Sequence, residues 1–418
     1  MRPAVTTLDN GLRVVTDRIE GVESASVGVW VGAGTRYEGA EVNGIAHLLE
    51  HMAFKGTARR SAEAIAEQIE SVGGHLNAYT GHEITAYYAR VLKEDVALAI
   101  DILADILQHS VFDETELARE RAVVLQEIGQ VLDTPDDIVF DRFQSVAFPE
   151  QPLGRPVLGA PETVERLSRR ALTDYLNGHY GGPSMILAAA GKVEHDAVVA
   201  LAAEAFRDLP PAHPDRPVPG AYGGGEFRED RPLEQLHLVL GFEGVGFHDD
   251  AFHAGSVLST LLGGGMSSRL FQEIRERRGL AYSVHTFTNP YADAGLIGVY
   301  AGTGGRDAEE LVPVLCAELA RVADDASDEE VDRARAQIKA NLLMGLESTA
   351  ARCERMAQHM LVYNRPVPVA ETVASLDRVD AATVRALAER LFRQPPALAA
   401  IGPTRHLPSY DGIARRLA

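Results

Sequence analysis

Cysteine is scarce in this chain. Its 418 residues include only two cysteines, Cys316 and Cys353. Two cysteines exclude a disulfide scaffold and a four-cysteine zinc site. Both fall in segments with a helical pattern, so we expect them to be small buried side chains.

Long apolar runs and a surplus of basic residues are also missing. No stretch approaches the roughly 18 consecutive apolar residues of a membrane-spanning helix, so no membrane span is expected. The first residues lack the apolar segment and cleavage site of a secretory signal, so the expected location is cytoplasmic. Lys and Arg number 40 against 60 Asp and Glu, a net charge of −20. This balance argues against a general nucleic-acid-binding protein, which needs a basic surface.

The composition that remains is that of a soluble globular protein long enough for two to four domains. The clearest break runs from 209 to 235, where five prolines precede three consecutive glycines. Such a segment cannot continue a helix or a central strand and is typical of a linker. The sequence therefore predicts an N-terminal domain at 1–208, a linker at 209–235 and a C-terminal domain at 236–418.

The two halves share a weak pattern that indicates duplication. An apolar strand at 24–34 has a counterpart at 237–244, and each is followed by helices and then a further strand, at 74–80 and 279–284. Strands mixed with helix pairs predict an α+β fold of two homologous α/β sandwiches, each a mixed sheet with helices.

Several elements are signalled individually. Asn10-Gly11 predicts a turn between two strands. A Ser61 N-cap begins a helix that ends at Gly73. Further helices are predicted at 93–109 and 113–133. Further strands are predicted at 12–16, 24–32, 76–80, 84–92, 185–191 and 397–401.

The strongest chemical signal is His47-Leu-Leu-Glu50-His51. Residues four apart lie on one face of a helix, so both imidazoles can reach one metal ion. Glu50 lies close to the same face and can act on a metal-bound water. Catalytic zinc needs a third protein ligand and leaves its fourth position open.

The helix predicted at 113–133 offers Glu114, Glu116, Glu120 and Glu127 as third ligands. Glu120 and Glu127 are seven residues apart and share a face. One of them can bind metal while the other orients ligands or handles protons. The alternative is a solvated acidic helix, but Glu127 lies in the apolar run 123–128. A partly buried carboxylate needs a cation or a donor.

The order His-x-x-Glu-His marks the inverzincins. The chain resembles the pitrilysin-type metallopeptidases, in particular the mitochondrial processing peptidase β subunits and their bacterial homologues. The resemblance covers nearly the whole chain, and its motifs lie at 9–14, 32–38, 44–57, 73–80, 267–271 and 275–282.

The resemblance implies a role for each matching residue. His47, His51 and Glu127 would bind one zinc ion per chain, Glu50 would be the general base, and Glu120 would support the site. Asn77, Ala78 and Tyr79 match an edge strand that pairs with the substrate backbone, and Arg275 and Tyr282 match a pair that contacts the substrate near the cleaved bond. One departure is Gly81-His82-Glu83, where close relatives often carry Ser-Arg-Glu.

The expected function is a zinc-dependent endopeptidase that cuts extended or unfolded peptides, with basic peptides favoured by the acidic chain. The resemblance implies that a chain of this size forms half of a clam-like shell around an enclosed chamber. A homodimer is the first expectation, and a heterodimer with an inactive homologous subunit is the second. Two other functions stay open: a noncatalytic structural subunit of a larger complex, and a peptidase dedicated to maturing one peptide precursor.

Overall fold

The computed structural model describes residues 3–211 and 216–417, which fold into two compact units. Each unit is assembled from three segments of chain. The first takes Met1–Gly129, Arg155–Val218 and Leu343–Pro368, and the second takes Gln130–Gly154, Pro219–Leu342 and Val369–Ala418. Each unit therefore contains one helix from the opposite half of the sequence. The predicted domains, 1–208 and 236–418, are continuous stretches of sequence, and their limits stay a prediction.

The first unit is built on a six-stranded mixed sheet in the order β1-β2-β6-β3-β5-β4. β2 and β6 are parallel, and every other neighbouring pair is antiparallel. The strands are β1 (Ala4–Thr7), β2 (Arg13–Arg18), β3 (Ser24–Val31), β4 (His75–Thr80), β5 (Thr85–Leu92) and β6 (Met185–Gly191). These bounds confirm the predicted strands and the Asn10-Gly11 hairpin, in which Gly11 has a φ of 90°.

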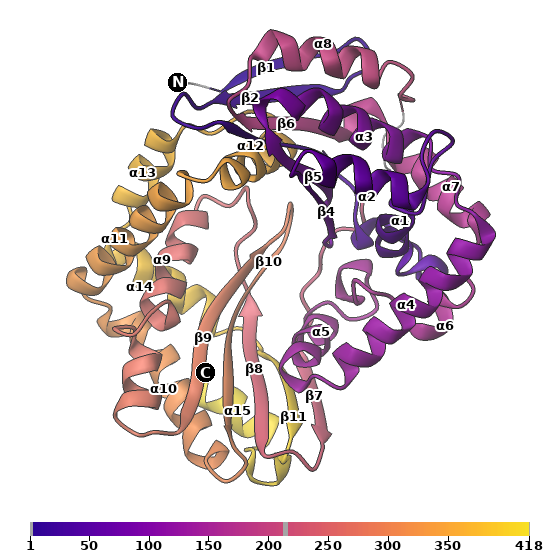
Figure 1. The fold of residues 1–418 in the computed structure, drawn as a ribbon. Coiled ribbons are helices and arrows are strands. Elements are labelled where there is room, and N and C mark those ends of the chain that lie inside the picture. The colour runs from indigo at the N-terminus through magenta and orange to yellow at the C-terminus, as the bar shows by residue number, and fades with distance from the viewer. Residues whose placement is uncertain (1–2, 212–215, 418) are drawn as a thin grey trace. The chain divides into compact units, whose positions relative to one another are not determined.

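Helices cover both faces of this sheet. α12 packs against β6, β3 and β2 on one face, and α3 and α8 pack against the sheet from the other. In Figure 1 the gold helix α12 lies beside the indigo strands, although more than 300 residues of sequence separate them. The helices of this unit are α1 (Ile45–Ala53), α2 (Ala62–Ser71), α3 (Val96–Gln108), α4 (Glu114–Leu132, which crosses the unit boundary), α6 (Pro161–Val164), α7 (Arg169–His179), α8 (His195–Ala205) and α12 (Thr349–Tyr363), with short turns η1 (Thr35–Tyr37), η2 (Ala40–Val42), η3 (Lys93–Asp95) and η5 (Gly182–Ser184).

The second unit contains a five-stranded sheet in the order β7-β11-β8-β10-β9. Its strands are β7 (Gly225–Asp230), β8 (Gln235–Glu243), β9 (Ala281–Pro290), β10 (Gly295–Gly304) and β11 (Ala397–Gly402). β7 and β11 are parallel, and the other pairs are antiparallel. This is the order and direction of β2-β6-β3-β5-β4 in the first unit, so the predicted duplication is confirmed.

Two glycines repeat between the sheets and show the duplication at atomic scale. Gly191 ends β6 with a φ of 124°, and a Cβ there would lie 2.3 Å from the Ser24 carbonyl oxygen. Gly402 ends β11 with a φ of 129°, and a Cβ there would lie 2.4 Å from the Gln235 carbonyl oxygen. Only glycine adopts such a φ without strain while a neighbouring strand passes so closely.

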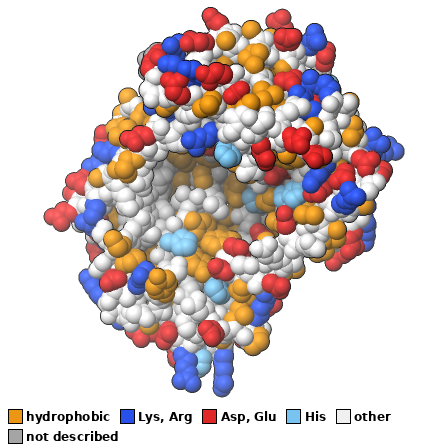
Figure 2. All heavy atoms as spheres, in the orientation of Figure 1, with side chains coloured by type: hydrophobic (Ala, Val, Ile, Leu, Met, Phe, Trp, Pro, Cys, Tyr) orange, Lys and Arg blue, Asp and Glu red, His pale blue; other side chains and the backbone are white. Residues whose placement is uncertain are grey.

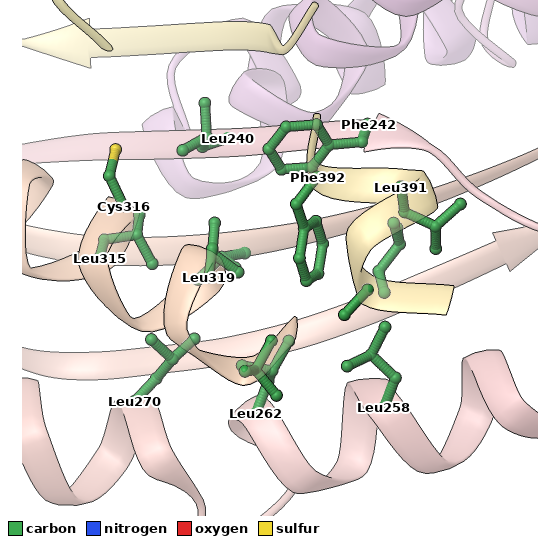
Figure 3. Close-up of a cluster of buried hydrophobic side chains, with 14 of the residues drawn as sticks. Leu240, Phe242, Leu258, Leu262, Leu270, Leu315, Cys316, Leu319, Leu391 and Phe392 are labelled. Atoms are coloured by element: carbon green, nitrogen blue, oxygen red, sulfur yellow. The ribbon is translucent and has the colours of Figure 1, made fainter. Parts of the chain in front are cut away.

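Most helices of the second unit contribute to one large apolar cluster, part of which is drawn in Figure 3. Cys316 lies in this cluster and Cys353 lies in α12, and both are free and buried as predicted. The helices are α5 (Pro135–Ala147), α9 (Phe252–Gly263), α10 (Ala308–Asp325), α11 (Asp328–Gly345, which crosses the unit boundary), α13 (Val369–Asp377), α14 (Ala381–Phe392) and α15 (Tyr410–Leu417), with short turns η4 (Pro152–Gly154) and η7 (Thr404–His406) and the π-helix η6 (Phe271–Glu276).

The predicted linker at 209–235 is only partly irregular. Its proline-rich start includes 212–215, which lie outside the described residues. Its end forms strand β7 at the edge of the second sheet, and that part of the linker prediction is wrong. The six residues of β7 include no proline, so no backbone donor is missing where the strand pairs with β11.

No helix among the described residues is long and apolar enough to cross a membrane. Acidic and basic side chains are interspersed over the face of the molecule seen in Figure 2.

Candidate metal and substrate site

Helix α1 carries the His47–His51 pair. Its apolar side, which includes Ile45, Leu48 and Met52, is buried. This packing fixes the helix and turns both imidazoles to one side, with ring centroids 4.7 Å apart. Burial, followed by repulsion from His51, lowers the pKa of His47 to about 4. Its imidazole is therefore neutral at pH 7, which is the form that binds metals.

The start of α1 is fixed by a residue that the sequence did not single out. The buried carboxylate of Glu38 accepts hydrogen bonds from the backbone nitrogens of Gly44 and Ala46 and from the Asn43 amide, each at 2.8 Å. Gly44 has a φ of 96° and no capping side chain of its own. Glu38 thus caps the helix from a distance, and burial raises its pKa to about 7. The sequence signal that could have predicted this role is a glutamate a few residues before an apolar helix. Glutamates are too common for that signal to be specific.

Helix α4 brings Glu127 to the two histidines. Its carboxylate Oε2 lies 3.7 Å from His47 Nε2 and 3.5 Å from His51 Nε2. One ligand atom from each of the three residues lies within 4.8 Å of the others. Within the part of the chain that the structure describes, no other group of three potential metal ligands comes this close together.

The donor set fits a zinc ion. Two imidazole nitrogens and a carboxylate oxygen are ligands that catalytic zinc sites use. Ligand atoms in a tetrahedral zinc site lie about 3.4 Å apart, as bond lengths near 2.1 Å require. The separations of 3.5 and 3.7 Å between Glu127 and the histidines are close to that value. Three protein ligands also leave one position for water.

Glu120 contacts Nδ1 of His51, on the side of the ring away from the Nε2 atom that faces Glu127. Its carboxylate is 3.0 Å from His51 Nδ1, and Lys55 Nζ lies 2.8 Å from the other oxygen. A hydrogen bond from Nδ1–H to Glu120 leaves the lone pair of His51 on Nε2, which faces Glu127. Lys55 was not predicted as part of the site, and its position four residues after His51 is the signal that could have found it.

Glu50 lies between α1 and strand β4. The Thr80 hydroxyl donates a hydrogen bond of 2.6 Å to its carboxylate. Burial raises the pKa of Glu50, and the Thr80 hydrogen bond opposes that rise. A carboxylate with a raised pKa is a stronger proton acceptor. Thr80 was not predicted, although it lies directly after the predicted substrate strand.

Asn77, Ala78 and Tyr79 lie on β4, which is an edge strand of the first sheet. The Ala78 N–H points away from β5, because it donates to the Asn77 side chain at 2.8 Å. Backbone groups of alternate residues on an antiparallel edge point outward, so those of Leu76, Ala78 and Thr80 share this direction. An extended peptide can pair with such an edge.

Arg275 and Tyr282 belong to the second unit and lie next to each other. The Arg275 guanidinium lies 4.5 Å from the centre of the Tyr282 ring and 4.7 Å from that of Phe271. The Tyr282 side chain is exposed, so both its hydroxyl and the guanidinium can reach a ligand.

A duplicated α+β fold with this His-His-Glu cluster defines a class of metalloproteases. Residues 13–161 match the family described as Insulinase (Peptidase family M16), and residues 166–338 match the Peptidase M16 inactive domain. The chain belongs to peptidase family M16.

Relatives match almost the whole chain. It is 39% identical over 400 residues to an uncharacterized zinc protease of Rickettsia felis, covering 96% of this chain and 97% of that protein. It is also 39% identical over 425 residues to the human mitochondrial-processing peptidase subunit beta, covering 98% and 86%. The fold matches a protease from Helicobacter pylori with a TM-score of 0.88 at 22% identity, covering 96% of this chain and 99% of that one. The predicted family is therefore confirmed.

Proposed function

We propose that the chain is a zinc-dependent endopeptidase that hydrolyses extended peptides. The observation that carries this proposal is the convergence of His47, His51 and Glu127 beside Glu50, within reach of an open strand edge. The proposed ligands are the same three residues, with one zinc ion per chain. When bound, zinc supplies Lewis-acid chemistry and lowers the pKa of a coordinated water to about 7.

The other residues do the positioning and the proton transfer. The β4 edge holds the peptide backbone through Asn77, Ala78 and Tyr79. Glu50 accepts a proton from the attacking water and returns it to the amine nitrogen of the leaving peptide. Glu120 orients His51. The phenol of Tyr282 and the guanidinium of Arg275 are hydrogen-bond donors suited to the oxygen that becomes negative during attack.

The substrates that we propose are unfolded or short peptides, bound in an enclosed chamber of which one chain forms half. A homodimer is the proposed assembly, because one chain carries both the His-x-x-Glu-His motif and the Arg275–Tyr282 pair. A partnership with an inactive homologous subunit is the alternative. The proposed location is the cytoplasm.

The test is cleavage of a quenched fluorescent peptide by the purified full-length chain loaded with zinc. Wild type is compared with Glu50→Gln, and zinc is measured in both. Glu63→Gln on the exposed side of α2 is the matched control. We expect wild type and the control to cleave, and Glu50→Gln to keep its zinc but lose at least a hundredfold in rate. Undiminished cleavage by Glu50→Gln would falsify the assignment, and a zinc-loaded wild type that cleaves no peptide would favour a structural subunit.

A further inference from the structure

The turn between β4 and β5 follows the hydroxyl group that contacts Glu50. Thr80 is the last residue of β4, and its side chain donates to the Glu50 carboxylate at 2.6 Å. Residues 81–83 then form the turn, and β5 begins at Thr85. The position of the Thr80 hydroxyl therefore depends on what holds this turn in place.

The turn packs on the short helix η1, shortly after the end of β3. The Thr35 N–H donates to the Gly81 carbonyl at 3.2 Å, and the Arg36 N–H donates to the His82 carbonyl at 2.8 Å. The Thr35 hydroxyl also lies 3.1 Å from His82 Nδ1. These hydrogen bonds fix the first two residues of the turn against η1.

A buried arginine supplies a charged part of this attachment. The Arg36 side chain is buried, and its Nη1 lies 2.5 Å from the carboxylate of Glu83, whose side chain is only 15% exposed. Nη2 of the same guanidinium donates to the backbone carbonyl of Val218 at 2.8 Å. Loss of one partner of a buried ion pair leaves the other charge uncompensated, so the two side chains hold each other firmly. The guanidinium thus joins the turn to Val218.

Val218 lies where the chain leaves the first unit. The second segment of that unit ends at Val218, and Pro219 begins the next segment of the second unit. A following proline restricts the backbone of Val218 to extended conformations, which limits the directions in which its carbonyl can point. Arg36 therefore connects the departing chain to the turn that follows Thr80.

We propose that Arg36 is a positioning residue for catalysis. It couples the backbone at Val218 to the general base Glu50, by way of the turn and the Thr80 hydroxyl. The inference rests on the proposed function, in which Glu50 accepts the proton of the attacking water. Lysine cannot replace this arginine, because a single ammonium group lacks the planar fork whose two nitrogens reach two separate acceptors.

The first test is a double-mutant cycle on peptide cleavage by the zinc-loaded full-length chain. Thr80→Val keeps the branched shape and removes the hydroxyl that donates to Glu50. Arg36→Lys keeps the charge and removes the fork. Each change is expected to lower kcat about tenfold, with KM within about twofold of the wild-type value. The double variant is expected to lose about tenfold as well, because both changes break the same connection.

Arg60→Lys is the matched control. Arg60 is a second largely buried arginine of the first unit, and its carboxylate partners, Asp101 and Asp105, lie on α3. We expect Arg60→Lys to lower the melting temperature but to keep kcat within about twofold of wild type. Combined with Thr80→Val, it should give the kcat of Thr80→Val alone. A role of Arg36 in stability only would make the two arginine variants alike.

The outcomes separate this inference from the proposed function. Losses that multiply to about a hundredfold in the double variant overturn the inference alone. A kcat of Arg36→Lys within about twofold of wild type also overturns it. A zinc-loaded wild type that cleaves no peptide overturns the proposed function and the positioning role with it.

Hydrogen exchange followed by mass spectrometry gives a second readout that does not depend on activity. It is recorded without substrate on wild type, Arg36→Lys and Arg60→Lys. In Arg36→Lys, peptides covering 75–84 and 216–224 are expected to exchange about tenfold faster than in wild type, because both ends of the connection are released. Arg60→Lys should leave both peptides unchanged. Unchanged exchange at 75–84 in Arg36→Lys would overturn the coupling, and so would equally faster exchange in both variants, which reports a general loss of stability.

Discussion

The pairing of Glu120 with His51 leads to a sharp prediction about metal affinity. The two carboxylate oxygens of Glu120 face two donors, His51 Nδ1 at 3.0 Å and Lys55 Nζ at 2.8 Å. A glutamine has one acceptor oxygen, so in Glu120→Gln one of these donors must face the amide NH₂ group. His51 then loses either its fixed orientation or its fixed tautomer.

The magnitude follows from the effect of partners that orient metal ligands. Their removal weakens metal binding by roughly 10- to 100-fold, which equals about 1.4–2.7 kcal/mol. We therefore expect the zinc affinity of Glu120→Gln to fall within this range. Glu127→Gln should lose more, because it removes a proposed ligand instead of its support. The measurement is competition for zinc between the full-length chain and a chromophoric chelator.

Two further variants make the test specific. Glu116→Gln lies one turn earlier on α4, pairs with Arg119, and should bind zinc like wild type. In the double variant Glu120→Gln/Lys55→Met the amide no longer faces an ammonium group, so part of the affinity should return. Zinc affinity of Glu120→Gln within twofold of wild type, with an unchanged circular dichroism spectrum, would refute the reasoning.

Three predictions concern stability. Glu38→Ala leaves the buried N–H groups of Gly44 and Ala46 without their acceptor, so the free energy of unfolding should fall by about 3 kcal/mol in denaturant titrations; a loss below 0.5 kcal/mol would contradict the remote cap. Burial lowers the pKa of His82 to about 4, so stability present above pH 6.5 is lost as the pH falls toward 4. At pH 5 wild type should lose about 2 kcal/mol more than His82→Gln, relative to pH 7.5, and parallel pH profiles would disprove this. Arg269→Met breaks a pair with Glu330 in which the side chains are only 8% and 18% exposed, and it should cost about 3 kcal/mol, whereas exposed Arg277→Met should cost less than about 1 kcal/mol; equal melting temperatures would count against the difference.

Local patterns in the sequence predicted the helices and strands well. The Ser61 cap, the turn at Gly11 and the apolar strands depend on neighbours within a few residues, and the structure reproduces them. Strand β7 was not predicted because the prolines at the start of the same segment indicated a linker. Its pairing partner, β11, also lies far away in sequence, so no local pattern predicts the pair.

The candidate site divides in the same way. His47 and His51 are separated by one helical turn, so their convergence can be read from the sequence. Glu127 lies near them only because the fold brings its side chain from α4 to those of α1, and spacing alone left Glu120 and Glu127 both open as ligands. The structure separates the two carboxylates, since only Glu127 faces both Nε2 atoms, while Glu120 faces Nδ1 of His51.

The groups that the sequence did not predict are those that hold others in place. Glu38 caps α1 from six residues before Gly44, and Thr80 reaches Glu50 from another element. Glu354 comes from α12, in the opposite half of the sequence, and lines a small cavity of the first unit together with Trp30 of β3, Tyr79 of β4 and Tyr88 of β5. An exchange of helices between halves makes a site depend on both halves of the chain. A fragment that ends before α12 would keep His47, His51 and Glu127 but lack the helix that packs on β2, β3 and β6 of the sheet that carries the substrate edge.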